Sequence, residues 1–276
     1  MEVMQTPGME VSKNGTRLTA RNRFATPRTP REVVDGVWLL GSRRVNFYAL
    51  TEGKSVTLVD AGFYGHLRYL NEWLAATGRS HRDVEAIVIT HGHADHLGFA
   101  GDFDRRGVSV YVHEDDLAIS RSTNVRRPPP RITRNLWRPS ALALLAEAAN
   151  DSVFTQPPVP GARPFAADEH LDVPGRLRAV RVPGHSPGNC TLHHPGLDVM
   201  FTGDTLMTCD PMFGGEGPLV FSEHPANDEL CLQNLTLLRP FASAGLLPAH
   251  GEPDPAPGAL GAAIGSARIA KPGRRH

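Results

Sequence analysis

Hydrophobic positions follow two alternating patterns from residue 37 onward. Short apolar runs bounded by glycine or charged residues are typical of strands, and they occur at residues 37–40, 45–50, 56–59, 84–89, 108–113, 177–181, 199–204 and 245–251. Helical spacing or composition occurs between them, at residues 64–77, 97–104, 140–150, 227–238 and 255–269. Strands that alternate with helices predict an α/β domain.

The two ends of the chain lack this patterning. Residues 1–32 carry scattered arginines and Thr–Pro steps without apolar periodicity, which predicts a flexible arm, or alternatively a basic tail that binds an acidic partner. Residues 271–276 are a basic end with too few apolar side chains to pack. We therefore expect one compact domain at residues 33–270.

Composition and charge restrict the classes of function. The chain has 276 residues, 40% of them hydrophobic, which is enough for one large domain. Its 29 basic and 29 acidic residues balance, so no overall field favours nucleic acid or an anionic membrane. We expect a small-molecule substrate and leave the oligomeric state open.

The three cysteines form no Cys-x-x-Cys pair, and no signal peptide or membrane span is recognisable, which predicts a cytoplasmic protein.

Four side chains that commonly bind metals lie within six residues, directly after the apolar run 84–89. They are His91, His93, Asp95 and His96. A helix or strand would send such close neighbours to different sides, whereas a loop at a strand end can gather them around one point. A carboxylate among imidazoles favours an open catalytic metal site over a closed structural one. The alternative is a solvated loop that contains histidines by chance.

Three more residues of this type each follow a predicted strand. They are His185 in the turn 182–188, Asp204 after the run 199–203, and His250 after the run 245–249. Ligands on loops at strand ends converge on one edge of a sheet. Each residue alone would be interpreted as structural, but in this order, behind the first motif, they predict a metal site.

These elements, together with the turn 60–62, resemble the metallo-β-lactamase superfamily of hydrolases, specifically its glyoxalase-II-like branch with two metals. The resemblance covers roughly residues 36 to 252. It implies a four-layer αββα sandwich with two mixed sheets and outer helices.

The resemblance also implies how the ligands are shared. One metal ion would be held by His91, His93 and His185. The other would be held by Asp95, His96 and His250. Asp204 would bridge the two ions, which are expected to be zinc, with iron or manganese as alternatives. Spacing alone indicates only that seven suitable ligands exist.

The implied chemistry is hydrolysis by a hydroxide that bridges the metals. A bound ion can lower the pKa of water from 15.7 to about 7, so a nucleophile for a substrate carbonyl is available at neutral pH. Asp95 is expected to act in catalysis by orienting this nucleophile and relaying its proton. Asp60 is expected either to fix an imidazole from behind or to be only a turn carboxylate.

The substrate is narrowed by departures from known branches. β-Lactamases generally lack the bridging Asp, and glyoxalase II adds a helical domain for which the residues after His250 are too few. Lactonases for homoserine lactones usually have a tyrosine just after the bridging Asp, but this chain has none after Tyr111. We therefore predict a hydrolase of a small-molecule ester, thioester or lactone.

Two other functions remain open at this stage. Persulfide dioxygenases keep a similar ligand motif but use a single iron for oxidation, and the spacing here does not exclude that reaction. A non-catalytic binding protein with a degenerate site is the other alternative, which the complete ligand set disfavours.

Residues 114–168 interrupt the alternation of strands and helices. The segment contains a proline-rich stretch with three arginines, Arg126, Arg127 and Arg131, followed by the helical run 140–150. By analogy with the family, its ends flank the metal-bearing edge, so it is either a partial lid that sets substrate choice or a surface excursion. The arginines either meet an anionic group of the substrate or form a solvated loop.

Overall fold

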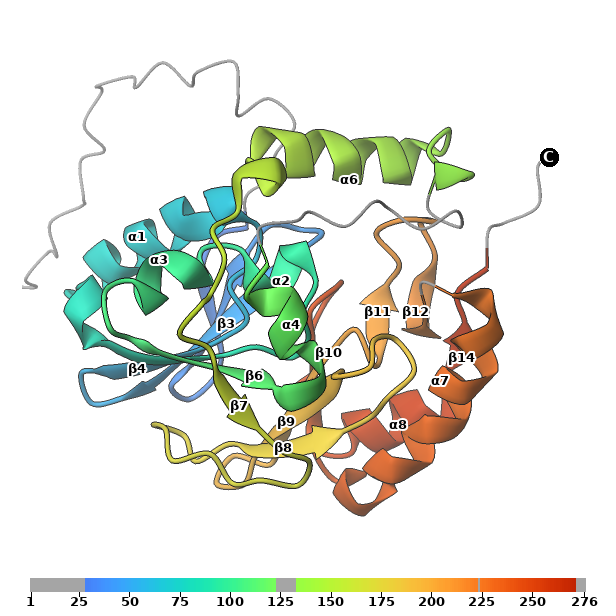
Figure 1. Ribbon diagram of the computed structural model, residues 1–276. Helices are drawn as coiled ribbons and strands as arrows, with labels where there is room; N and C mark the ends of the chain where they lie inside the picture. The colour runs from blue at the N-terminus through green and yellow to red at the C-terminus, as the bar shows by residue number, and fades with distance from the viewer. Residues whose placement is uncertain (1–27, 123–132, 223, 272–276) are drawn as a thin grey trace, which may run out of the picture.

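The computed structural model describes residues 28–122, 133–222 and 224–271, and it has two packed sheets between outer helices (Figure 1). The larger sheet has seven strands in sequence order, β1 (Arg31–Val34), β2 (Val37–Gly41), β3 (Asn46–Glu52), β4 (Ser55–Val59), β5 (Val84–Val88), β6 (Ser109–His113) and β7 (Arg163–Phe165). Its first four strands pair antiparallel, and β4 to β7 pair parallel. The sheet is therefore mixed.

The second sheet lies across the first. It has the order β13-β10-β9-β8, with strands β8 (Arg178–Arg181), β9 (Cys190–His194), β10 (Val199–Gly203) and β13 (Gly245–Pro248). A smaller ladder of β11 (Met207–Cys209), β12 (Glu216–Val220) and β14 (Arg268–Ile269) lies beside it. The β10–β13 pair is parallel and the β9 pairs are antiparallel, so this sheet is mixed as well.

The helices complete the outer layers. They are α1 (Leu67–Ala76), α2 (Ala94–Leu97), α3 (Ala100–Asp104), α4 (Leu117–Ser120), α6 (Pro139–Asn150), α7 (Asp228–Asn234) and α8 (Ala259–Ser266). Short 3₁₀ turns adjoin them at Tyr64–His66, His81–Asp83, Glu114–Asp116, Val153–Thr155, Pro225–Asn227 and Leu235–Phe241.

Three of the hydrophobic clusters formed by the described residues lie between the layers. In the first, Trp73 of α1 packs with residues of the large sheet such as Leu58. In the second, Tyr48 of the large sheet packs edge-on against Phe201 of the second sheet, with ring centroids 5.2 Å apart. In the third, Met200 packs with Leu260 of α8. Helix, sheet, sheet and helix therefore form the predicted αββα sandwich, and the fold prediction is confirmed.

Several element boundaries differ from the prediction. No strand was predicted at residues 205–221, but they contain the hairpin β11–β12. The last helix, expected over 255–269, covers only Ala259–Ser266 and is followed by β14. Residues 28–32, expected in the arm, include the start of β1, which pairs with β2. Residues 1–27, 123–132 and 272–276 lie outside the described residues, and with them Arg126, Arg127 and Arg131.

Helix α6 of the segment 114–168 is fixed to α1 and to the loop between β2 and β3 by ion pairs whose carboxylates are buried. Glu147 pairs with Arg44 (3.0 Å), and Asp151, just past the helix, pairs with Arg68 (2.5 Å). His66 lies between the two carboxylates, 3.2 Å from Asp151 and 3.7 Å from Glu147. At its other end α6 contacts the β11–β12 hairpin, where the Ser140 hydroxyl donates to the carbonyl of Met212 (2.8 Å).

Replacing Glu147 with Gln is expected to lower the free energy of unfolding at pH 7 by about 1–3 kcal/mol, the usual cost of losing a buried charged hydrogen-bond partner. Burial alone would raise the pKa of Glu147, but bonds from His66, Ser42 and Arg44 outweigh it and lower the pKa below the ordinary 4.5. A depressed folded-state pKa gives stability that is present above pH 4.5 and lost as pH falls through the folded-state value. Denaturant titrations at several pH values measure this difference.

The matched control is Glu72→Gln, a carboxamide change on the exposed face of α1. Its unfolding free energy should stay near that of the unaltered protein at each pH. A Glu147→Gln variant with unaltered stability at pH 7, or with a deficit that does not shrink in acid, would show that the buried pair does not hold α6.

Candidate metal centre

The first metal-type motif follows β5 directly. His91 and His93 lie in the loop that leaves the strand, and Asp95 and His96 lie in the first turn of α2. Gly98 then ends α2 with a φ of 26°, and a Cβ there would lie 2.1 Å from the carbonyl oxygen of Gly62. Only glycine fits so close to another backbone, so this contact fixes the loop against the turn 60–62.

The seven predicted ligands come together in two adjoining groups. Ligand-type atoms lie within 4.8 Å of one another in the group His91, His93, His185 and Asp204, and also in the group Asp95, His96 and His250. In the first group, Nδ1 of His93 lies 2.9 Å from Nε2 of His91 and 3.1 Å from Nε2 of His185. In the second, Asp95 lies 3.8 Å from Nε2 of His96 and 3.6 Å from Nε2 of His250.

Asp204 connects the two groups because its two carboxylate oxygens point in different directions. Oδ2 lies 3.3 Å from Nε2 of His185 and 4.0 Å from that of His91. Oδ1 lies 3.1 Å from Nε2 of His250 and 3.4 Å from that of His96. The carboxylate is buried just past the end of β10.

Three of the imidazoles are oriented by a hydrogen-bond acceptor at Nδ1, the ring nitrogen that faces away from the other ligands. Nδ1 of His185 donates to the carbonyl of Phe221 (2.8 Å), and Nδ1 of His250 donates to the carbonyl of Arg44 (2.5 Å). Nδ1 of His96 donates to the carboxylate of Asp60 (2.8 Å). A neutral imidazole that donates through Nδ1 presents a lone pair at Nε2. Three such lone pairs therefore face inward, as in metal-bound histidines.

Asp60 is held by the backbone that bears the motif. Its Oδ1 accepts from the amide of Thr90 (2.8 Å), and its two oxygens accept from the Thr90 hydroxyl at 3.0 and 2.9 Å. Asp60 has a φ of 62°, a left-handed conformation that Asp adopts more readily than most residues. Asp60 was predicted either to fix an imidazole or to close a turn. In the structure it does both, because it accepts from His96 and has the backbone conformation of a turn residue.

Burial and neighbouring charges set the protonation of the site. Burial lowers the pKa of His91 well below its ordinary value and also lowers that of His185. Burial would also lower the pKa of His250, but Asp204 and Asp95 outweigh it and raise the pKa to about 9. The pKa of His96 is likewise raised, because Asp60, Asp95 and Asp204 outweigh burial.

This pattern fits divalent cations. The carboxylates of Asp95 and Asp204 attract positive charge to the inward nitrogens of His96 and His250, and a proton or a metal ion can supply it. Metal ions bind deprotonated imidazole and carboxylate and release protons as they bind. A set of nitrogen and oxygen donors with inward lone pairs suits zinc, iron or manganese, so the residues present fit the implied metals.

Sequence reasoning missed some residues around the site. Main-chain carbonyls such as those of Arg44 and Phe221 cannot be recognised from side-chain patterns, and Thr90 was not singled out. His113 accepts from the amide of Asp115 (3.2 Å) and so caps the turn Glu114–Asp116. The amide of Cys209 donates to the carbonyl of His250 (3.4 Å), and the thiol of Cys209 is half-buried.

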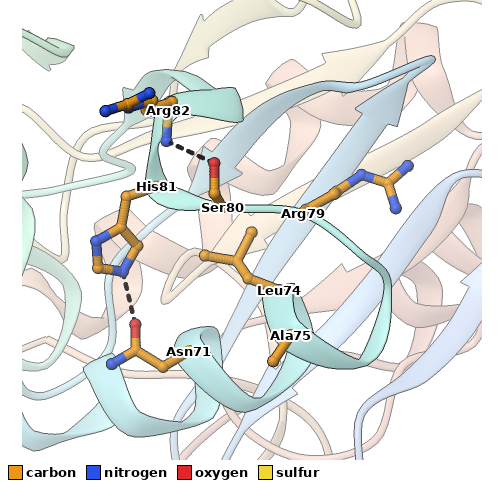
Figure 2. A pocket seen from close by; sticks show the side chains of 7 residues that line it. All are labelled: Asn71, Leu74, Ala75, Arg79, Ser80, His81 and Arg82. Atoms are coloured by element: carbon orange, nitrogen blue, oxygen red, sulfur yellow. Dashed lines mark hydrogen bonds between the residues drawn. The ribbon is translucent and has the colours of Figure 1, made fainter.

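Two other features lie apart from this centre. The buried group His66, Glu147 and Asp151 also has ligand-type spacing, but Arg44 and Arg68 already neutralise its carboxylates. A surface hollow of about 490 Å³ lies at the end of α1 (Figure 2) and is lined by Asn71, Leu74, Ala75, Arg79, Ser80, His81 and Arg82. None of the seven ligands lines that hollow.

Comparisons with known proteins agree with this architecture. The sequence model of the Metallo-beta-lactamase superfamily matches residues 40–269. The chain therefore belongs to the metallo-β-lactamase superfamily.

Individual relatives are more distant. The chain is 24% identical over 165 residues to "Probable metallo-hydrolase YybB" of Bacillus subtilis, a match that spans 59% of this chain and 63% of that protein. It is 39% identical over 75 residues, 27% of each chain, to "Exodeoxyribonuclease WalJ" of Streptococcus pneumoniae. The crystal structure of the metallo-beta-lactamase family protein TTHA1429 from Thermus thermophilus superposes with a TM-score of 0.60 and 25% identity, covering 84% of this chain and 78% of that one.

Within residues 28–122, 133–222 and 224–271, every helix is too short or too polar to cross a bilayer.

Proposed function

We propose that this protein is a hydrolase of the glyoxalase-II-like branch that binds two divalent metal ions, with zinc the expected ion, and cleaves a small-molecule ester, thioester or lactone. The observation that carries the proposal is the placement of Asp204, whose two oxygens face different histidine pairs. A single-metal site would need only one of those oxygens.

The chain's own residues have distinct tasks in this proposal. His91, His93 and His185 would hold one ion, Asp95, His96 and His250 the other, and Asp204 both. The bound ions supply Lewis acidity and lower the pKa of water. Asp95 is the most exposed carboxylate of the site, with 23% of its side chain accessible against 8% for Asp204. It can therefore reach an attacking water, orient it and accept its proton.

An apolar cluster supports a small organic substrate. Met207, Met212, Phe213 and Phe221 pack together on and beside the β11–β12 hairpin. The ring of Phe221 lies 6.1 Å from that of His185, so this cluster adjoins the first histidine group. An apolar wall beside a few convergent polar groups is typical of small-molecule sites.

The segment 114–168 is proposed to influence substrate choice through α6. Ala141 packs into the same apolar cluster, and Ser140 bonds the carbonyl of Met212. Loosening α6 should therefore move the hairpin that bears the apolar wall. The Glu147→Gln variant should change the relative kcat/KM values among substrates of different acyl length. If these kcat/KM ratios are unchanged, the segment 114–168 has no role in substrate choice through α6.

Metal analysis and a substrate panel test the proposal together. Protein purified without added metal should contain about two zinc or manganese ions per chain, and the loaded enzyme should hydrolyse at least one member of a panel of thioesters, aryl esters and lactones. Removing the metal with a chelator should abolish turnover, and adding it back should restore turnover. One iron per chain with sulfide-dependent oxygen uptake, or cleavage of DNA in place of these substrates, would overturn the proposal.

A cytoplasmic location and the absence of nucleic-acid or membrane partners are also proposed. The balanced charge of the chain supports them, as do its three cysteines, Cys190, Cys209 and Cys231, none of which forms a disulfide in the described residues. Fractionation of cells that express the full chain tests the location, and recovery outside the cytoplasm would contradict it.

A further inference from the structure

We infer that Asp116 is a positioning residue for the first histidine group, because one carboxylate fastens both loops that bear His91, His93 and His185. The inference rests on the proposed two-metal function. It adds a residue that is not itself a ligand and that lies in another part of the chain.

Asp116 accepts hydrogen bonds from two separate loops. Its Oδ2 accepts from the amide of Gly92 (2.8 Å) and from the hydroxyl of Ser186 (3.0 Å). Its Oδ1 accepts from the amide of Gly188 (3.0 Å). Gly92 lies between His91 and His93, whereas Ser186 follows His185 directly and Gly188 lies three residues after it. The three bonds therefore connect all three histidines of this group through their backbones.

The carboxylate is brought between the loops by the sheet. Strand β6 pairs parallel with β5, so the chain leaves both strands at the same edge. The 3₁₀ turn Glu114–Asp116, capped by His113, then places the Asp116 side chain in the interior with no exposed surface. A buried carboxylate needs several donors to offset its desolvation, and the two loops supply them.

Close packing limits how the loops can move. A Cβ at position 188 would lie 2.6 Å from Cγ of Asp116, and one at position 92 would lie 3.3 Å from its Cβ. The glycines thus let both backbones approach the carboxylate directly. Because the site geometry depends on this approach, a change in hydrogen-bonding capacity at Asp116 should be transmitted to the histidines.

The second group is held in a different way. His96 is oriented by Asp60, and His250 by the carbonyl of Arg44. The inference therefore predicts an unequal effect on the two groups. Weakening the hydrogen bonds to Asp116 should lower the metal affinity of the first group much more than that of the second.

The test is Asp116→Asn, which keeps the shape of the side chain but replaces one acceptor oxygen by an NH₂ group. In either orientation, at least one of the two loops then faces a donor in place of an acceptor. We expect zinc affinity at the first group to fall about 10- to 100-fold, the usual effect of removing a partner behind a metal site. Affinity at the second group should change by less than about threefold by the same reasoning.

Zinc titrations against a chromophoric chelator resolve the two affinities, and two reference variants assign them. His185→Ala should remove the first-group affinity, and His250→Ala the second. The visible spectrum of the cobalt-loaded protein provides a second readout, in which Asp116→Asn should perturb the band that His185→Ala removes. Asp210→Asn is the matched control, because Asp210 is also buried and accepts two backbone amides, but from the β11–β12 hairpin. It should leave both affinities unchanged.

The outcomes separate this inference from the function on which it rests. Equal weakening of both groups, or no weakening, in a folded Asp116→Asn variant would overturn the positioning role alone. If the unmutated protein binds fewer than two ions per chain, both the positioning role of Asp116 and the proposed function are wrong. If Asp116→Asn does not fold, Ser186→Ala removes one of the three bonds and should weaken only the first group, by a few-fold; unchanged affinity there would refute the inference.

Discussion

Replacing Asp204 with Asn is expected to lower kcat by about a thousandfold or more, an effect of roughly 4 kcal/mol, and to reduce bound metal below two ions per chain. The two oxygens of Asp204 face His185 on one side and His250 on the other. An amide is neutral and has one acceptor oxygen, so it cannot serve both sides. The pKa of His250 should also fall, because Asp204 is the largest influence that raises it.

Metal content and steady-state kinetics of the same preparation measure this effect. The control is Asp198→Asn at the opposite end of β10, where a half-exposed carboxylate bonds His193 and Ser243. That variant should keep the metal content and kcat of the natural protein. An Asp204→Asn enzyme with two ions per chain and unaltered kcat would refute the bridging role.

Replacing Asp60 with Asn is expected to weaken metal binding by about 10- to 100-fold while leaving the fold intact. Asn tolerates the left-handed conformation seen at Asp60, so the backbone should be kept. The amide loses an acceptor for the three donors that converge on the carboxylate. The ring of His96 would then lose the group that sets its tautomer.

Comparing two variants separates charge from backbone strain. Asp60→Ala should lose as much metal affinity as Asp60→Asn and should also unfold more easily, because Ala adopts positive φ only at a cost of about 1 kcal/mol or more. Chelator titration and thermal unfolding measure the two effects independently. If the Asp60→Asn variant binds metal as tightly as the unmutated protein, His96 does not need a carboxylate as its hydrogen-bond acceptor.

The ligand set could be predicted because its signals are local. His91, His93, Asp95 and His96 are adjacent in the sequence, and each remaining ligand ends a strand that its apolar run reveals. The structure brings all seven together, whereas their roles as metal ligands stay predictions. Asp116 was not singled out, because an acidic run after a strand resembles the solvated start of a helix. Its function depends on two loops that are distant in sequence.

The elements were predictable where one face is clearly apolar. Leu70 and Trp73 gave α1, and the buried runs gave the central strands. The hairpin at 205–221 was missed because its strands are short, its ladder shifts register, and Pro218 argues against a paired strand. The early end of the last helix reflects the pairing of β14 with β12, a tertiary contact without a local signal.

The acceptors behind the imidazoles differ in their sensitivity to mutation. His185 and His250 are aligned by main-chain carbonyls, which every amino acid at positions 221 and 44 would still provide. His96 depends on the side chain of Asp60. Among relatives that keep this architecture, the alignment of these two imidazoles therefore sets no requirement on the side chains at positions 44 and 221, whereas the alignment of His96 should allow few replacements at position 60.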